Sequence, residues 1–164
     1  MSYPSMLLKL SHVFYHQPEQ VFDLWVDEHH AASWLFGGPD QYTDVIRIDA
    51  RVGGRFFASG RSGAKPIVHQ GQFHVLQRPQ QILFSVSPYP DQMEPDLIQI
   101  KFERCPFGCE LHLTHQLSAR FSAERPRLIE NWTQLFARMA LELDDSSSTQ
   151  PQISSSKAQI SGLV

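Results

Sequence analysis

The stretch RPRLIENWTQLFARMALEL, residues 125–143, decides the fold of this chain. Its apolar side chains recur at the spacing of one broad stripe along an α-helix: Leu128, Ile129, Trp132, Leu135, Phe136, Met139 and Leu143. Pro126 is compatible with the first turn of that helix. Asp144 and Asp145 oppose the helix dipole, so the sequence predicts that the helix ends there.

A stripe of this kind needs an apolar surface to cover, and the preceding sequence supplies one. Segments with an apolar–polar period of two are typical of strands that bury one face. The predicted strands are 6–14, 45–52, 55–60, 67–76, 82–86, 97–103 and 109–117. In the first two of these strands, the residues expected on the buried face are Leu8, Leu10, His12 and Phe14, then Ile46, Ile48, Ala50 and Val52.

Two short helices are expected between the first two strands. Pro18 opens the first, and Asp27 is placed to cap a second that reaches Trp34. We therefore predict an α+β fold in which a curved antiparallel sheet of about seven strands wraps around a long C-terminal helix. The expected domain spans residues 1–145, and the Ser- and Gln-rich residues 146–164 are expected to form a disordered tail.

The bulk composition excludes some classes of function. A net charge of -3 without a Lys/Arg cluster disfavours nucleic-acid binding. No apolar run approaches the roughly 20 residues that span a bilayer, and the N-terminus lacks the features of a signal peptide, so a cytoplasmic location is expected. Cys105 and Cys109 flank a turn at Pro106-Phe107-Gly108, and two free thiols are expected in a reducing compartment.

Six segments in this order carry a resemblance to a known family. They are Pro18 to Trp25 (PEQVFDLW), Trp34, Asp49 to Phe56 (DARVGGRF), His69 to Phe73 (HQGQF), Gly108 to His115, and Asn131-Trp132. The chain resembles the START-like (SRPBCC) superfamily and, within it, the domain named after the activator of the heat-shock protein ninety ATPase. The resemblance covers about Leu8 to Leu143, nearly the whole predicted domain.

The resemblance implies the helix-grip fold, with the first strand paired to the last and an interior pocket for hydrophobic ligands. Members of the superfamily range from lipid carriers to cyclases to chaperone regulators, so the fold does not fix the function. This chain departs from the family pattern at three positions. Asn131 stands where the family usually has Gly, Cys109 where it usually has Thr, and His12 where it often has Arg.

Three histidines are in phase with the apolar faces of their strands, namely His12, His69 and His115. We expect no Asp or Glu side chain on the apolar face of any strand. These imidazoles are either the polar points of an apolar pocket, able to orient a ligand or move a proton, or hydrogen-bonded structural groups. In the strand order that the resemblance implies, His69 and His115 lie three strands apart, on the order of 14 Å, which disfavours a shared metal.

The sequence therefore predicts neither a metal site nor a cofactor. We find no serine nucleophile with a base at useful spacing, and Gly53-Gly54 lacks the Lys and helix of a phosphate-binding loop. The catalytic candidates are His69 and His115 alone. The residues expected to touch a ligand are Trp34, Phe56, His69, Phe73, Phe84, Val86, Ile98, Ile100, His115, Trp132 and Phe136.

Three functions are compatible with these residues. The first is binding of a small hydrophobic or aromatic ligand in a cavity between the sheet and the C-terminal helix. The second is a cyclase- or hydrolase-type enzyme that uses His69 or His115 as general acid–base. The third, implied by the resemblance, is regulation of a chaperone ATPase through protein contact. A homodimer is left open.

Overall fold

One antiparallel sheet organises the molecule. The structure, a computed structural model, describes residues 4–87 and 94–163. The strand order is β1-β7-β6-β5-β4-β3-β2, so the first strand pairs with the last, as expected. The strands are β1 (Ser5–Phe14), β2 (Gln41–Ile48), β3 (Arg55–Ser62), β4 (Lys65–Gln77), β5 (Gln81–Ser87), β6 (Asp96–Cys105) and β7 (Gly108–Ser118).

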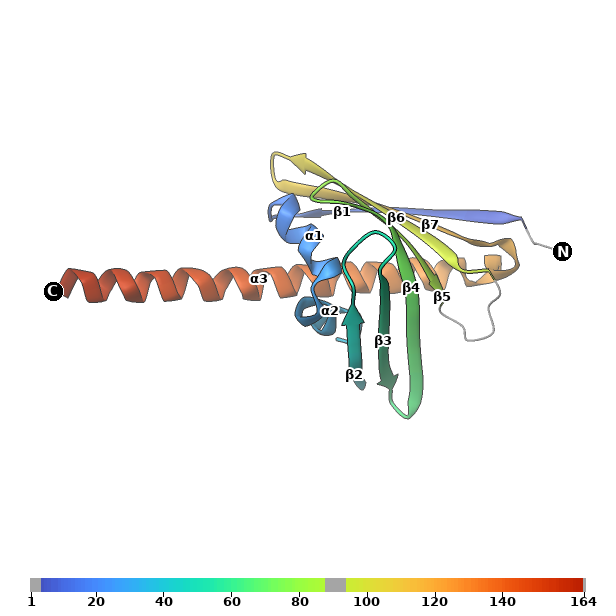
Figure 1. The fold of residues 1–164 in the computed structure, drawn as a ribbon, viewed down its shortest axis with the longest axis horizontal. Coiled ribbons are helices and arrows are strands. Elements are labelled where there is room, and N and C mark those ends of the chain that lie inside the picture. Colours follow the sequence, from blue (N-terminus) through green and yellow to red (C-terminus); the bar gives the residue numbers. More distant parts are fainter. Residues whose placement is uncertain (1–3, 88–93, 164) are drawn as a thin grey trace.

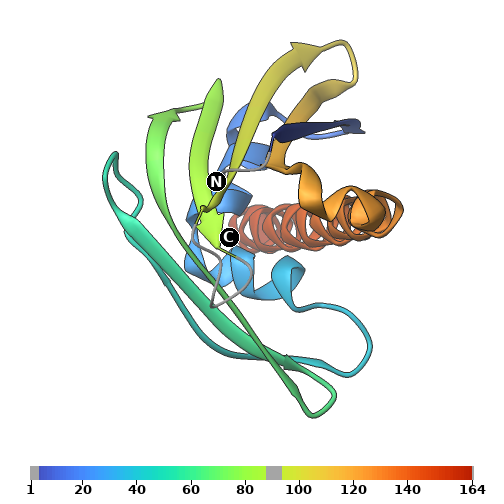
Figure 2. The same ribbon diagram turned by 90° about the vertical axis from the view of Figure 1, so that its right-hand side faces the viewer.

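The helices lie on one side of this sheet. Two short helices, α1 (Pro18–Val26) and α2 (Glu28–Leu35), follow β1, and a 3-10 turn, η1 (Ala119–Glu124), leads into the long helix α3 (Arg125–Leu163). Figure 1 shows α3 crossing the sheet, and Figure 2, which looks along it, shows the sheet curling around it. The predicted helix-grip architecture is confirmed.

The core forms where the inward face of the sheet meets α3. Leu8, Ile98 and Leu111 are almost completely buried on the sheet side, in the alternating pattern that the sequence predicted. On the helix side the buried part of the apolar stripe is Trp132, Phe136, Met139 and Leu143, whereas Ile129 is 37% exposed. Burial of each large apolar side chain contributes about 1.5–3 kcal/mol relative to exposure.

The two short helices begin where local sequence chemistry places them. Pro18 occupies the first turn of α1, and Gln17 and Gln20 form a reciprocal capping box there. The Asp27 side chain accepts a hydrogen bond from the backbone N–H of His30, 3.1 Å away, and caps α2. Both predicted helix starts are confirmed, and the pair carries Trp25 and Trp34 into the core.

The strand that follows is shorter than predicted. β2 ends at Ile48, and Ala50 and Val52 are exposed rather than on the buried face. The reason is a tight turn in which the Arg51 N–H donates to the carbonyl of Asp49 at 2.8 Å. Gly53 completes the turn at a φ of 83°, a left-handed conformation that glycine adopts without steric cost.

The last helix is longer than predicted. α3 continues to Leu163, past Asp144 and Asp145, because an unfavourable dipole contact costs only about 0.3–1 kcal/mol and does not end a helix by itself. The division into a folded domain, residues 1–145, and a disordered tail, residues 146–164, stays a prediction. The proline-rich sequence from Ser87 to Pro95 predicts a loop between β5 and β6, and most of it, residues 88–93, lies outside the described residues. Within the described chain, no helix has the length and apolarity needed to cross a membrane.

Candidate functional site

A buried chain of polar groups connects α3 to the sheet. The indole Nε1–H of Trp132 donates to Nδ1 of His115 at 3.1 Å, and Nε2 of His115 lies 2.8 Å from Oδ2 of Asp96. His115 and Asp96 are each 5% exposed. Because an indole N–H can only donate, Nδ1 accepts, and the His115 proton is on Nε2, where it donates to the carboxylate. Both ring nitrogens of His115 are therefore engaged.

Strand alternation places this chain inside the fold. His115 on β7 lies opposite Ile98 on β6, and Asp96 precedes Ile98 by two residues, so all three side chains face α3. The expectation that no Asp or Glu shares the apolar phase is therefore wrong. The predicted strand started at Leu97, one residue too late, although extending its period of two by one step would have found Asp96.

An aromatic cluster surrounds the polar chain. The Trp25 ring lies at the centre, with centroid distances of 5.1 Å to Trp34, 6.1 Å to Trp132 and 6.4 Å to Phe84. Phe136 stacks on Trp132 at 6.0 Å. The cluster joins α1, α2 and α3 to the sheet. The sequence predicted Trp34, Phe84, Trp132 and Phe136 as ligand contacts and did not include Trp25, which lies on α1.

The Trp25 indole carries an unsatisfied polar atom. Its side chain is 6% exposed, yet Nε1 has no hydrogen-bond acceptor among the described residues. The neighbouring Trp34, in contrast, donates its indole N–H to the carbonyl of Leu24 at 2.8 Å. Leaving a buried donor without an acceptor costs about 1–3 kcal/mol, so this atom needs a specific explanation.

The inward face continues toward β3 and β4 with further aromatic rings. The Phe56 ring lies 5.6 Å from Phe73 and 5.4 Å from Phe84. This arrangement requires glycine at position 71, because a Cβ there would lie 2.6 Å from the Phe56 ring and would collide with the Ser85 carbonyl. Phe56 and Phe84 are half-buried, whereas Phe73 is buried.

Two pockets found on the described residues both lie outside this interior. One, of about 440 Å³, is lined mainly by outward-facing side chains of β2 to β5. The other, of about 80 Å³, lies at the ends of β1, β6 and β7, beside Pro95. The predicted cavity between the sheet and α3 corresponds to neither pocket, because Trp25, Trp132 and Phe136 pack closely there.

A family comparison agrees with this architecture. The sequence model of the Activator of Hsp90 ATPase homolog 1-like proteins matches residues 15–144 of the chain. The chain belongs to this family. No curated protein matches the chain.

Solved structures of low identity share the family's fold. A solution structure of an AHSA1-like protein from Aeromonas hydrophila has a TM-score of 0.74 and 19% identity over 87% of this chain and 94% of its own. A crystal structure of a protein from Chromobacterium violaceum has a TM-score of 0.74 and 18% identity over 84% and 96%. A Staphylococcus aureus protein of unknown function has a TM-score of 0.79 and 14% identity over 89% and 98%.

The other two inward histidines of this family member lie apart from the polar chain. His69, on β4 opposite Ala58, stacks on Phe36 with centroids 6.2 Å apart, and burial lowers its pKa. His12, on β1, lies 5.6 Å from the Phe136 ring, and burial lowers its pKa as well. β4 and β7 are three strands apart, as predicted, and no group of three or more metal-ligating side chains occurs within the described residues.

The remaining predicted ligand contacts are on the inward face. Val86, Ile98 and Ile100 are buried there, and His69 is half-buried. The structure therefore places the predicted residues on the inward face of the sheet, on α2 and on α3, with His69 and His115 three strands apart. Whether they touch a ligand stays a prediction.

The structure also brings together a serine, a histidine and an aspartate that the sequence analysis did not connect. His16, just after β1, lies 2.9 Å from Asp144 Oδ1 through Nε2 and 3.4 Å from Ser147 Oγ through Nδ1. The serine contact is long for a hydrogen bond to an activated nucleophile. Neither of the two pockets described above includes these residues.

Cys109 is not an activated nucleophile. Cys105 and Cys109 are free thiols at the ends of the β6–β7 turn. Burial, with a smaller contribution from Cys105, raises the pKa of Cys109 to about 12. A thiol with this pKa is protonated at neutral pH and is a weak nucleophile.

Proposed function

We propose that this protein binds a small hydrophobic or aromatic ligand between its sheet and α3, and that the ligand carries a hydrogen-bond acceptor. The observation that supports this proposal is the buried Trp25 Nε1–H, which has no acceptor among the described residues. A carbonyl or ether oxygen on an apolar frame would satisfy this donor. Pockets of this kind hold apolar ligands and fix their orientation with a few polar groups.

Entry of the ligand requires side chains to move. Trp25, Trp132 and Phe136 pack against one another in the interior, and neither of the two pockets lies there, so we expect the aromatic cluster to open when a ligand enters. Phe56 and Phe84 on the sheet and Leu128 and Leu135 on α3 are only half-buried, and they are the side chains we expect to move. The Trp132–His115–Asp96 chain would remain fixed, because each member is hydrogen-bonded.

The experiment is a thermal-unfolding series with aromatic ketones, from acetophenone to 2-acetylnaphthalene. Ethylbenzene and 2-ethylnaphthalene are matched controls that lack the oxygen. The ketones should raise Tm by a few degrees at concentrations well above Kd, and the hydrocarbons by less. Trp25→Phe should abolish the difference between ketone and hydrocarbon. Equal stabilisation by both series in the wild-type protein, or none by either, contradicts the proposal.

An enzyme remains a weaker alternative. His115 has both ring nitrogens engaged, so acid–base chemistry there would first break a buried hydrogen bond. His69 is the better of the two predicted catalytic candidates, because burial lowers its pKa and favours the neutral, proton-accepting ring. Loss of a measured turnover in His69→Ala, with ligand binding retained, would favour this alternative.

The remaining predictions concern partners and location. The description of the family names a chaperone ATPase activator, so contact with such a chaperone is a hypothesis for this chain as well. Stimulation of Hsp90 ATPase by the purified protein would support it. The homodimer and the cytoplasmic location also stay predictions.

A further inference from the structure

The outward face of the sheet carries a pocket that is separate from the proposed interior site except at Phe56, which belongs to both. Its volume is about 440 Å³, which lies within the usual range for small-molecule sites. Strand register aligns its side chains in rows. Arg47 on β2 lies opposite Phe57 on β3, which lies opposite Gln70 on β4, which in turn lies opposite Ser87 on β5.

A second row runs beside the first. Arg55 on β3 lies opposite Gln72 on β4, and Gln72 lies opposite Ser85 on β5. Arg55 is two residues from Phe57, the partner of Arg47, so the two arginines are diagonal neighbours. Their Cβ atoms are expected about 7–8 Å apart, within reach of one shared ion for side chains of this length.

The pocket is positively charged. The described residues that line it contribute two guanidinium groups and no carboxylate. Arg55 has no hydrogen bond or ion pair through its side chain in the part of the chain that the structure describes. Arg47 uses one nitrogen, Nη1, to donate to the carbonyl of Ile46 at 3.0 Å, which leaves its other N–H groups available.

Nearby carboxylates are already bound to other arginines. Asp49, at the end of β2, lies 2.8 Å from Nε of Arg51. Asp44 lies 3.7 Å from Nη2 of Arg61, farther along β3. Among the described residues, neither carboxylate forms an ion pair with Arg47 or Arg55, although Asp49 lies across the ladder from Arg55, whose carbonyl accepts its backbone N–H at 3.0 Å.

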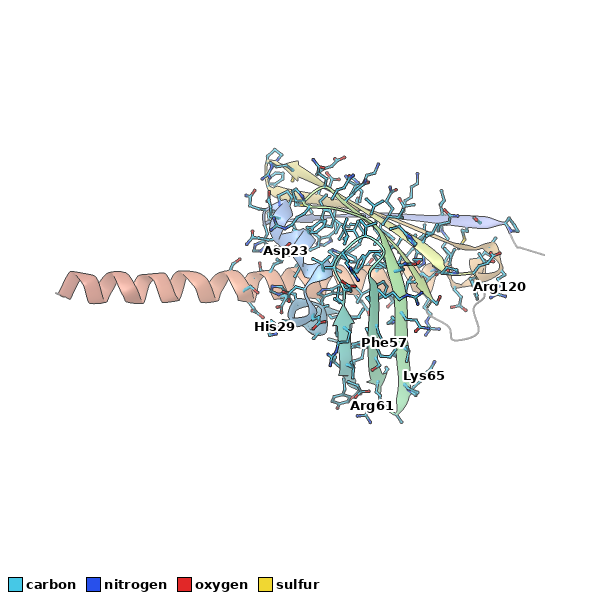
Figure 3. The ribbon with its side chains drawn as sticks, in the orientation of Figure 1. Asp23, His29, Phe57, Arg61, Lys65 and Arg120 are labelled. Carbon is cyan, nitrogen blue, oxygen red and sulfur yellow. The ribbon has the colours of Figure 1, made fainter. Side chains whose placement is uncertain are left out.

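An aromatic ring lies beside both arginines, because Phe57 is opposite Arg47 and two residues along β3 from Arg55. Phe57 is 38% exposed, a large fraction for an aromatic side chain in the middle of a sheet. Figure 3 labels this residue on β3, with Arg61 farther along the same strand. A flat apolar group could pack on the ring while an attached anion reaches the guanidinium groups.

We propose that this outward pocket binds a small organic anion, a phosphate monoester or carboxylate attached to a flat apolar group. Arg47 and Arg55 hold the anion, Phe57 contacts the apolar group, and Ser87 and Gln70 offer further donors. Arginine suits this role because its planar guanidinium group forms paired hydrogen bonds with phosphate and carboxylate oxygens.

Phenyl phosphate is the probe for the first experiment, with binding followed through backbone amide signals in a ¹H–¹⁵N spectrum. The amides of Phe57, Gln70 and Ser87 should shift, and affinity should fall as ionic strength rises. Arg47→Gln and Arg55→Gln should each weaken binding by about tenfold or more, since a hydrogen bond to a charged group contributes about 1.5–3 kcal/mol. Phe57→Ala should weaken binding of phenyl phosphate but not that of inorganic phosphate.

Arg61→Gln is the matched control, because Arg61 is on the same strand and the same face but outside the pocket. It should leave the affinity unchanged. An equal loss in Arg61→Gln would mean that overall charge, not the pocket, attracts the probe, and would overturn the proposal. Absence of amide shifts with phenyl phosphate would also overturn it.

Vesicles containing phosphatidylserine distinguish a free ligand from a lipid headgroup. The proposal predicts that phenyl phosphate binds and that the protein does not sediment with the vesicles. Sedimentation that depends on Arg47 and Arg55, without binding of phenyl phosphate, would overturn the small-ligand assignment. The aromatic-ketone series addresses the interior site separately, so either proposal can fail alone.

Discussion

Two tryptophans that differ in one hydrogen bond allow a direct test at the scale of the residue. Trp25 and Trp34 are similarly buried and contact each other, but only Trp34 has an acceptor for its indole N–H. Replacement by Phe removes the N–H in both cases, together with part of the ring. Comparison of the two variants therefore separates the contribution of the hydrogen bond to stability from that of the aromatic contact.

We expect Trp34→Phe to destabilise the ligand-free protein more than Trp25→Phe. The difference in the free energy of unfolding should be about 1–3 kcal/mol, because only Trp34→Phe leaves a buried carbonyl, that of Leu24, without its donor. Urea denaturation of the two variants measures it. Equal losses would show that the Trp25 N–H is satisfied in solution, and would remove the observation on which the ligand proposal depends.

Histidine burial predicts the pH dependence of stability. Burial lowers the pKa values of His69 and His12, so the unfolded chain binds protons on these rings more readily than the folded chain. The contribution of these two neutral rings to the free energy of unfolding is therefore fully present above the ordinary histidine pKa of about 6.5. It is lost as the pH falls from there toward the lowered pKa values of the folded protein.

Urea denaturation at several pH values between about 7 and 5 tests this expectation. His69→Gln and His12→Gln should each flatten the loss of stability on acidification. His29→Gln, at an exposed position of α2, is the matched control and should keep the wild-type slope. If His69→Gln and His12→Gln both kept the wild-type dependence of unfolding free energy on pH, burial of these two histidines would not be its cause.

At the scale of the element, the spacing of apolar residues predicted most of the helices and strands. The predictions from this spacing were wrong where another interaction competes with burial. The stripe on α3 and the inward faces of the strands were predictable because burial of large side chains dominates there. β2 ended early because the Asp49–Gly54 turn satisfies backbone groups locally, which an apolar–polar pattern does not report. Asp96 was missed because a carboxylate at a strand end looks like loop sequence until its partner His115 is known.

The C-terminal part of α3 provides a prediction at the same scale. Leu143 is 4% exposed, whereas the sequence beyond residue 147 is rich in Ser and Gln and contains Pro151, which costs about 3 kcal/mol inside a helix. We expect deletion of residues 148–164 to change the free energy of unfolding by less than about 0.5 kcal/mol. Leu143→Ala should cost about 2–4 kcal/mol.

Thermal and urea unfolding of these two variants measure the contrast. A deletion as harmful as Leu143→Ala would show that the C-terminal part of α3 belongs to the folded domain. The predicted boundary at residue 145 would then be wrong.

At the scale of the whole molecule, fold and function are predictable to different degrees. Six short segments in order were enough to identify the helix-grip fold, because they mark its strands, turns and last helix. They could not predict how closely the interior packs, since that depends on how Trp25, Phe56 and Phe136 meet in space. Nor could they predict the outward pocket, because Arg47 and Arg55 become neighbours only through strand register.

The most direct test of the ligand proposal follows the three indole Nε1–H signals in a ¹H–¹⁵N spectrum during titration with 2-acetylnaphthalene. Trp→Phe variants assign each signal. We predict that the Trp25 signal moves most, toward the position of a hydrogen-bonded indole, while the Trp34 signal, already bonded to Leu24, stays in place. A stationary Trp25 signal at saturating ligand, or equal movement of the Trp25 and Trp34 signals, would contradict the account.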